Sequence, residues 1–199
     1  MGGESFINPD LITYDKIVQQ VTLPSLSRFE TNFPKIGFNG NYTEMKAPSV
    51  YELVGSTLFI NHLSGNPSYQ NACAIRGSRA LLYSGITIPV LRYGGTQRTE
   101  KGNDNYNYIL DAVSFNKFMI DKFGETSYKL TDIDANDANK VINLLKGKNG
   151  IYVILNNDGS INGAGYSGHV DFILNGQCIS GAFTRPTGGV KSIRIWVLK

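Results

Sequence analysis

Apolar side chains recur at helical spacing through the middle of the chain. The regular positions predict helices at residues 72–83, 108–123 and 134–145, because apolar residues return there every three or four positions. A weaker pattern predicts a helix at residues 10–20 within an otherwise irregular segment rich in Pro, Gly and Asn. Residues 49–63, SVYELVGSTLFINHL, read as a short helix followed by a strand.

The last third of the chain has a different pattern. Four short β-rich runs, separated by Gly and Asn turns, predict an antiparallel meander: GIYVILNNDG, GHVDFILNG, QCISGAF and VKSIRIWVLK. Helices followed by strands indicate an α+β fold, in which the helix at 72–83 packs on the C-terminal antiparallel sheet. Since no repeat or linker divides the sequence, residues 1–199 are expected to form a single domain, with 1–45 as a variable N-terminal segment.

One polar, glycine-rich stretch separates the first two predicted core helices. Residues 89–107, PVLRYGGTQRTEKGNDNYN, are expected to form a long loop that borders or covers a cleft. Within this stretch, residues 93–107 are a candidate for substrate gating.

Composition excludes several classes of function. The formal net charge is only +3 and the basic residues are scattered, so no nucleic-acid partner is expected. No window is long and apolar enough for a membrane span, and the N-terminal residues do not resemble an export signal, so synthesis in the cytoplasm is expected. The 2 cysteines and 2 histidines form no metal-binding spacing, which predicts neither a metal nor another cofactor.

Cys73 is the first candidate for chemistry. It falls in the first turn of the predicted helix at 72–83, behind Asn71 as a candidate N-cap, and free backbone N–H groups there favour a thiolate. The same N–H groups could hold an oxyanion. Gly77 lies one turn further along a face of small residues, which predicts the close approach of a strand. Without a base, the simpler interpretation is a buried, unreactive thiol in a tightly packed helix.

His169 supplies a candidate base. It follows Gly168 at the start of a predicted strand, and catalytic cysteine–histidine pairs are distant in sequence and adjacent in space. The other histidine, His62, is the alternative base, and its position before Cys73 would indicate a circularly permuted relative with a different activity.

The third member of a catalytic triad would orient the imidazole. The pair Asn175-Gly176 predicts a two-residue hairpin turn, which places Asp171 opposite Ser180 and His169 opposite Ala182. Asp171 and Ser180 would then share the face of His169. Cys178, further along the same hairpin, is expected to be structural.

Two blocks of sequence resemble a known family. The stretches NACAIRGSRALLYSGITIP at 71–89 and SGHVDFILNG at 167–176 are similar to those of the type VI secretion amidase effectors of the fourth amidase family, relatives of the NlpC-like papain-fold peptidases. Weaker agreement covers VYELVGSTL, the FMIDKFG helix end, GIYVIL and the terminal SIRIWVL, so the resemblance spans most of the chain after about residue 45.

The resemblance implies a papain-like (NlpC-type) α+β domain that cleaves peptidoglycan stem peptides. Cys73 would be the nucleophile and His169 the base, and the bond cleaved would join γ-D-glutamate to the diamino acid at position three. The protein would be delivered by the type VI apparatus into the periplasm of a target cell, and a cognate immunity protein would block its cleft. Asn71 and Gly168 would contribute to the substrate or oxyanion site.

The resemblance also implies a difference in the triad. The family has an aspartate on the strand after the histidine, where this chain has Ser180. Either Asp171 supplies the carboxylate, or Ser180 orients the ring. The family often has a disulfide near this point, for which Cys178 has no partner. Other functions remain open: a self-acting cell-wall hydrolase, a papain-like acyltransferase, or a non-catalytic binding module.

Overall fold

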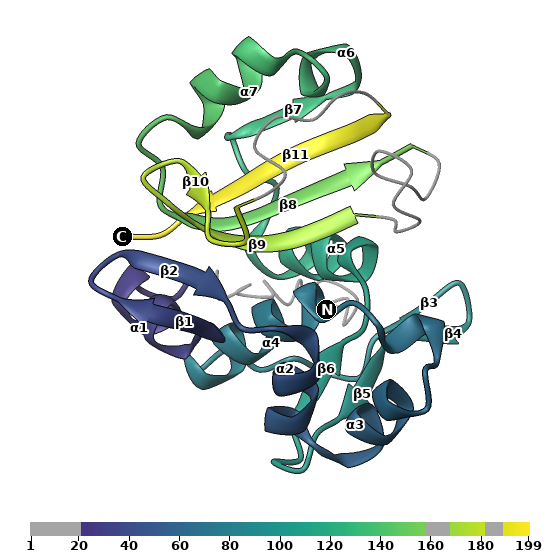
Figure 1. Ribbon diagram of the computed structural model, residues 1–199. Helices are drawn as coiled ribbons and strands as arrows, with labels where there is room; N and C mark the ends of the chain where they lie inside the picture. Colours follow the sequence, from purple (N-terminus) through teal and green to yellow (C-terminus); the bar gives the residue numbers. More distant parts are fainter. Residues whose placement is uncertain (1–20, 158–167, 182–188) are drawn as a thin grey trace, which may run out of the picture.

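The computed structural model describes residues 21–157, 168–181 and 189–199 (Figure 1). The helix expected at residues 10–20 lies outside these ranges. In the described part, no helix has both the length and the apolar character needed to cross a membrane.

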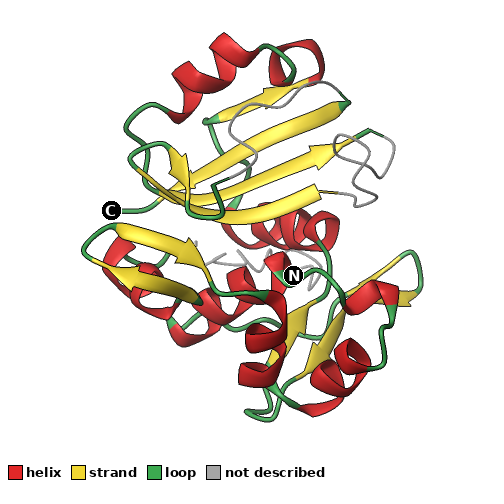
Figure 2. Cartoon of the chain, viewed as in Figure 1, coloured by secondary structure: helices red, strands yellow, loops and turns green. Residues whose placement is uncertain are grey.

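A five-stranded antiparallel sheet organises the C-terminal half of the chain (Figures 1 and 2). The strand order is β10-β9-β8-β11-β7. The strands are β7 (Lys129–Thr131), β8 (Gly150–Asn156), β9 (Gly168–Leu174), β10 (Gln177–Cys178) and β11 (Val190–Val197). All residues of β8 are buried, in agreement with its continuous apolar run at the centre of the sheet.

The expected meander is only partly correct. β8, β9 and β10 follow one another, and the register pairs Leu174 with Gln177, as the Asn175-Gly176 turn predicts. β11 does not continue past β10; it pairs with β8 on one side and with β7 on the other. Ile193, Ile195 and Trp196 of β11 are buried, and this apolar strand is covered best between two neighbours rather than at an edge.

Helices cover both faces of the sheet, which confirms the α+β class. On one face lie α1 (Leu26–Asn32), α4 (Cys73–Tyr83) and α5 (Ala112–Phe123), which form the larger apolar core with β8 and β9. On the other face lie α6 (Asp132–Ala135) and α7 (Ala138–Leu145), over a second, smaller core. The arrangement of these two layers is visible in Figure 1.

Two of the predicted helices have different starting points. The helix predicted at 108–123 begins at Ala112, because the Asp111 side chain caps it by accepting the backbone N–H of Ser114 at 2.8 Å. The preceding residues form β6 (Asn107–Ile109). The helix predicted at 134–145 is two helices, α6 and α7, since Asp137 caps a new start by accepting from the backbone N–H of Asn139 at 2.9 Å.

The strand expected within residues 49–63 is wrong. This segment forms the end of α2 (Ala47–Val54) and all of α3 (Ser56–Leu63), joined at Gly55 with φ 64°. With φ 64° and ψ −151°, Gly55 has a backbone conformation that other residues rarely adopt, which favours glycine between the two helices. Short apolar runs do not distinguish a strand from a helix, and this one is helical.

The long loop expected at 89–107 contains regular structure. It forms β3 (Arg92–Tyr93), β4 (Thr96–Gln97) and β5 (Thr99–Lys101), and β5 pairs with β6. Gly94 and Gly95, both with positive φ, make the turn between β3 and β4. The sequence before residue 50 also contains a hairpin, formed by β1 (Lys35–Phe38) and β2 (Asn41–Glu44).

Gly77 explains how closely α4 approaches the sheet. A Cβ at this position would lie 2.7 Å from Phe115 Cε2 on α5 and 2.9 Å from Val170 Cγ1 on β9. The close approach of a strand to this face of the helix, expected from the sequence, is therefore confirmed. This contact holds the start of α4 against the start of β9.

Replacing Gly77 with alanine is expected to destabilise the protein although alanine favours a helix. The added methyl group must displace Phe115 or Val170, at a cost of about 1–3 kcal/mol, typical of overpacking in a core. The free energy of unfolding from urea titration checks this result. Val113→Ala on α5, where the side chain is 47% exposed, is the control and is expected to change stability by less than about 0.5 kcal/mol. Equal stability of Gly77→Ala and the parent would contradict the packing described.

Candidate active site

Cys73 is the first residue of α4. The N-cap is Ala72, one residue later than the expected Asn71, and no side chain from the described residues caps this helix end. The backbone carbonyl of Asn71 is held by the Tyr51 hydroxyl, which donates to it at 3.1 Å. Because the first N–H groups of a helix have no partner within the helix, those of α4 remain available beside the sulfur.

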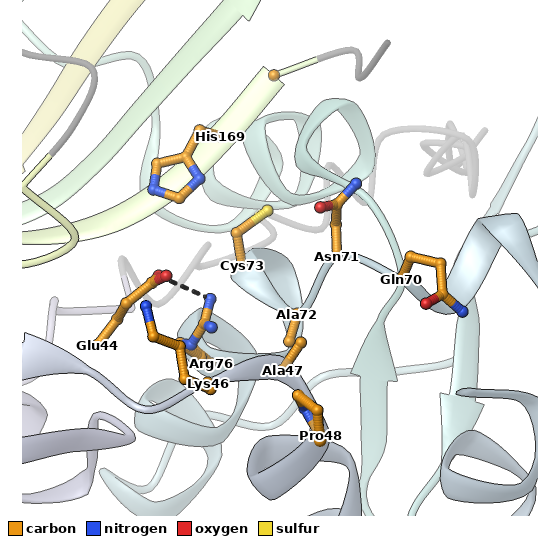
Figure 3. A pocket seen from close by; sticks show the side chains of 11 residues that line it. Glu44, Lys46, Ala47, Pro48, Gln70, Asn71, Ala72, Cys73, Arg76 and His169 are labelled. Atoms are coloured by element: carbon orange, nitrogen blue, oxygen red, sulfur yellow. Dashed lines mark ion pairs between the residues drawn. The ribbon is translucent and has the colours of Figure 1, made fainter. Parts of the chain in front are cut away.

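β9 brings His169 to this helix start. His169 is the second residue of β9, and Figure 3 shows its imidazole and the Cys73 sulfur directed toward one another. Both side chains are buried, with 8% exposed for each residue. They line a cavity of about 370 Å³ that is open to solvent. The cavity is lined by Glu44, Lys46, Ala47, Pro48, Gln70, Asn71, Ala72, Cys73, Arg76, Gly168 and His169.

The two side chains change each other's protonation. Burial would raise the pKa of Cys73, but hydrogen bonds from His169 and from the Val170 backbone N–H, with the charge of His169, lower that pKa below its usual value. Burial would likewise lower the pKa of His169, but hydrogen bonds to Asp171 and Cys73 raise it to about 9. Both shifts favour a thiolate on Cys73 beside an imidazolium on His169.

A buried carboxylate lies behind the imidazole. Asp171 is 1% exposed, and its Oδ2 lies 3.4 Å from His169 Nε2. The same oxygen accepts from Ser180 Oγ at 2.5 Å and from the Ser180 backbone N–H at 3.2 Å, while Oδ1 accepts from the Phe172 N–H at 2.8 Å. These donors stabilise the ionised carboxylate in a buried position.

The hairpin register expected from the sequence correctly predicts that Asp171 and Ser180 are neighbours. Ser180 lies beside Asp171 as predicted, although β10 ends at Cys178 and Ser180 follows in a turn, where it donates to the Asp171 carboxylate. The position expected for Ala182, opposite His169, lies outside the described residues. Cys178 is buried in the second core, and burial together with the nearby charge of Asp171 raises its pKa well above the ordinary thiol value. Cys73 and Cys178 are both free thiols.

His62 lies apart from this site. It belongs to α3, stacks on the Tyr51 ring at 4.6 Å between centroids, and has its Nδ1 2.8 Å from the backbone carbonyl oxygen of Tyr69. It does not line the cavity. The structure therefore brings together the predicted pair Cys73 and His169, with Asp171 and Ser180 behind it, and excludes His62 from the site.

Three charged residues of the cavity, Glu44, Lys46 and Arg76, were missed in the sequence analysis. Arg76, one turn after Cys73, is 4% exposed and forms an ion pair with Glu44 of β2 at 3.0 Å (Figure 3). The spacing of three residues on one helix face was a signal for Arg76. Glu44 could not be found this way, because its hairpin reaches the site only through the tertiary fold.

The remaining expectations for the site concern the loop and metals. The cavity lining includes no residue of 93–107, so this segment does not border the described site.

Among the described residues, no group of three or more His, Cys, Asp or Glu side chains could hold a metal ion.

The fold and the site together define a class of protein. A cysteine at the start of a helix, packed on an antiparallel sheet that carries a histidine and a carboxylate, is the arrangement of the papain-like cysteine hydrolases. Residues 69–196 match the model of a family described as Tae4, "Type VI secretion system (T6SS), amidase effector protein 4". This match covers more than half of the chain, which therefore belongs to the Tae4 family of type VI secretion amidase effectors.

Solved structures have the same fold. The Tae4–Tai4 effector–immunity complex from Enterobacter cloacae matches with a TM-score of 0.66 at 22% identity, over 89% of this chain and 100% of that chain. Tae4 from Enterobacter cloacae alone gives 0.67 at 20% identity, over 89% and 98%. The Tae4/Tai4 system from Salmonella typhimurium gives 0.63 at 19% identity, over 89% and 100%. No match was found among curated protein sequences.

These findings confirm the resemblance and the papain-like α+β fold expected from the sequence. As a member of this family, the protein is an antibacterial amidase effector that hydrolyses peptidoglycan.

Proposed function

We propose that the protein cleaves the bond between γ-D-glutamate and the diamino acid at position three of peptidoglycan stem peptides, with Cys73 as the nucleophile. The observation that carries the chemistry is the mutual direction of Cys73 and His169 in one solvent-open cavity. The membership of the chain in an amidase family supplies the class of reaction.

The reaction proceeds by acyl transfer to water. The Cys73 thiolate attacks the carbonyl carbon of the scissile bond, and the unpaired N–H groups at the start of α4 stabilise the oxyanion. The His169 imidazolium then gives its proton to the leaving amine, which frees the amino acid at position three. A water molecule, deprotonated by His169, attacks the thioester and releases the γ-glutamyl acid, which restores the Cys73 thiolate beside the His169 imidazolium.

The orientation of the imidazole follows from its neighbours. Because Nε2 of His169 lies beside Asp171, Nδ1 is the ring nitrogen that exchanges a proton with the Cys73 sulfur. Asp171 is therefore the third member, and Ser180 supports its carboxylate. Asn71 and Gly168 both line the cavity with Cys73 and would contact the substrate backbone. At Gly168 a Cβ would lie 2.4 Å from the Ile154 carbonyl oxygen, so the close approach of β9 to β8 at this point favours glycine.

Asp171→Asn is expected to lower kcat/KM by about 10- to 100-fold, because a charge-assisted hydrogen bond of about 1.5–3 kcal/mol is lost from the imidazolium. Ser180→Ala keeps the carboxylate and is expected to have the smaller effect. Steady-state hydrolysis by both variants across a range of pH checks this, with a downward shift of the His169 pKa only in Asp171→Asn. A larger loss in Ser180→Ala would make Ser180 the orienting residue.

The biological setting is part of the proposal. The relatives were solved in complex with Tai4 immunity proteins, and a cognate immunity protein that covers the cavity is expected for this chain also. The family description supports delivery by the type VI apparatus, from the cytoplasm of the producing cell to the periplasm of a target cell.

The test of the function is digestion of defined tri- and tetrapeptide muropeptides, with products identified by mass spectrometry. Release of the fragment that begins with the diamino acid supports the proposed bond. Cleavage at a different bond contradicts it, and a product joined to a new amine would indicate an acyltransferase instead.

A further inference from the structure

Arg76 is a charged residue at a buried position of the candidate site that the proposed mechanism does not use. It lies three residues after Cys73 on α4, a rise of about 4.5 Å along the helix, and both residues line the same cavity. A buried guanidinium is costly unless it is paired, and an apolar residue would fit the core side of this helix. The charge at this position therefore requires a reason.

The guanidinium is held in place from one side. Its Nε donates to the Met45 carbonyl at 2.8 Å, and its Nη1 pairs with Glu44 Oε2 at 3.0 Å. Both partners belong to the end of the β1–β2 hairpin or the residue after it. No acceptor from the described residues contacts Nη2, so a planar donor group remains for a ligand in the cavity.

The charge of the cavity favours an anion. Besides the paired Arg76 and Glu44, the lining contains Lys46, whose ammonium makes no ion pair with any described residue. The permanent charges of the lining are therefore two cations and one carboxylate. Arginine is the side chain that recognises a carboxylate with most geometric specificity, because its N–H groups match the two carboxylate oxygens.

The proposed substrate presents such a group beside the bond that is cleaved. Glutamate joined through its side-chain carboxyl keeps a free α-carboxylate, separated from the scissile carbonyl carbon by three carbons. With the carbonyl at the Cys73 sulfur, this carboxylate would lie in the same cavity that Arg76 and Lys46 line. We propose that Arg76, assisted by Lys46, binds the free α-carboxylate of the γ-linked glutamate and makes the enzyme selective for stem peptides in which this group is not amidated.

This proposal rests on the proposed function, and its test compares two substrates. One is a tripeptide stem with a free glutamate α-carboxylate, and the other is the same peptide with the α-amide. The parent enzyme is expected to cleave the amide with a kcat/KM lower by about 10- to 100-fold, the value of one charge-assisted hydrogen bond. Most of this difference is expected in KM, because the carboxylate is bound before and during the reaction.

Variants locate the selectivity at Arg76. Arg76→Met combined with Glu44→Gln removes both charges together, so that neither is left buried without a partner. This variant is expected to lose activity on the free acid and to cleave both peptides about equally. Arg79→Met, on the next turn of α4 and outside the cavity, is the matched control and is expected to keep the preference of the parent. Thermal unfolding by circular dichroism verifies that the variants are folded.

The outcomes separate the two proposals. If the parent cleaves both peptides at the expected bond with equal kcat/KM, the selectivity proposal is overturned and the function stands. A folded double variant that keeps the preference likewise overturns the role of Arg76. If the parent cleaves neither peptide at that bond, both proposals fail. Should the double variant not fold, the comparison of the two peptides with the parent enzyme still decides whether the free carboxylate is recognised.

Discussion

Cys73→Ala is expected to abolish hydrolysis of stem peptides, with kcat reduced by about 10⁶-fold or to the limit of detection, since a nucleophile has no substitute in covalent catalysis. The fold should be retained, because the loss of one sulfur atom at the edge of the core leaves the apolar contacts of α4 in place. Muropeptide digestion followed by chromatography measures the activity, and circular dichroism verifies the fold.

Cys178→Ala provides the matched control for Cys73→Ala. Its sulfur is also buried, but it lies in the second core, and its raised pKa keeps it protonated and unreactive. This variant is expected to hydrolyse stem peptides. Unchanged activity of Cys73→Ala would identify the cavity as a binding site with an inert thiol, and the proposed mechanism would fail.

His169→Gln is expected to lower kcat/KM by about 10²- to 10⁴-fold, the usual contribution of general acid–base catalysis. The variant should also change the reactivity of Cys73. In the parent, the pKa of Cys73 is lowered, so the thiolate is populated at pH values below the pKa of an ordinary thiol. His169 stays protonated up to about pH 9. Iodoacetamide should therefore alkylate the parent well below pH 8.5, about the pKa of a free thiol.

Without the imidazolium, burial is the dominant influence on Cys73 and raises its pKa. The midpoint of alkylation in His169→Gln should therefore move to higher pH, as followed by mass spectrometry of the labelled peptide. His62→Gln is the control, because His62 lies outside the cavity, and its alkylation profile should match the parent. A profile shifted in His62→Gln and not in His169→Gln would reverse the assignment of the base.

Predictions from local pattern succeeded where a residue's immediate neighbours determine its conformation. Helix α4 begins within one residue of its expected start, and the Asn175-Gly176 turn placed Asp171 beside Ser180. The errors have local causes that periodicity does not reveal. Gly55 joins two helices where a strand was expected, and Asp137 begins a new helix within a single predicted one. In both cases an apolar pattern continued across a break in the backbone.

The sequence by itself determined the two halves of the candidate site. The positions of Cys73 at a helix start and His169 at a strand start follow from the spacing of apolar residues and from the turn-forming Gly and Asn residues around them. Only the tertiary structure decided that the strand approaching Gly77 is β9, that β11 returns to β8, and that the β1–β2 hairpin carries Glu44 to Arg76. Local signals cannot specify such contacts, because they depend on packing between segments far apart in the chain.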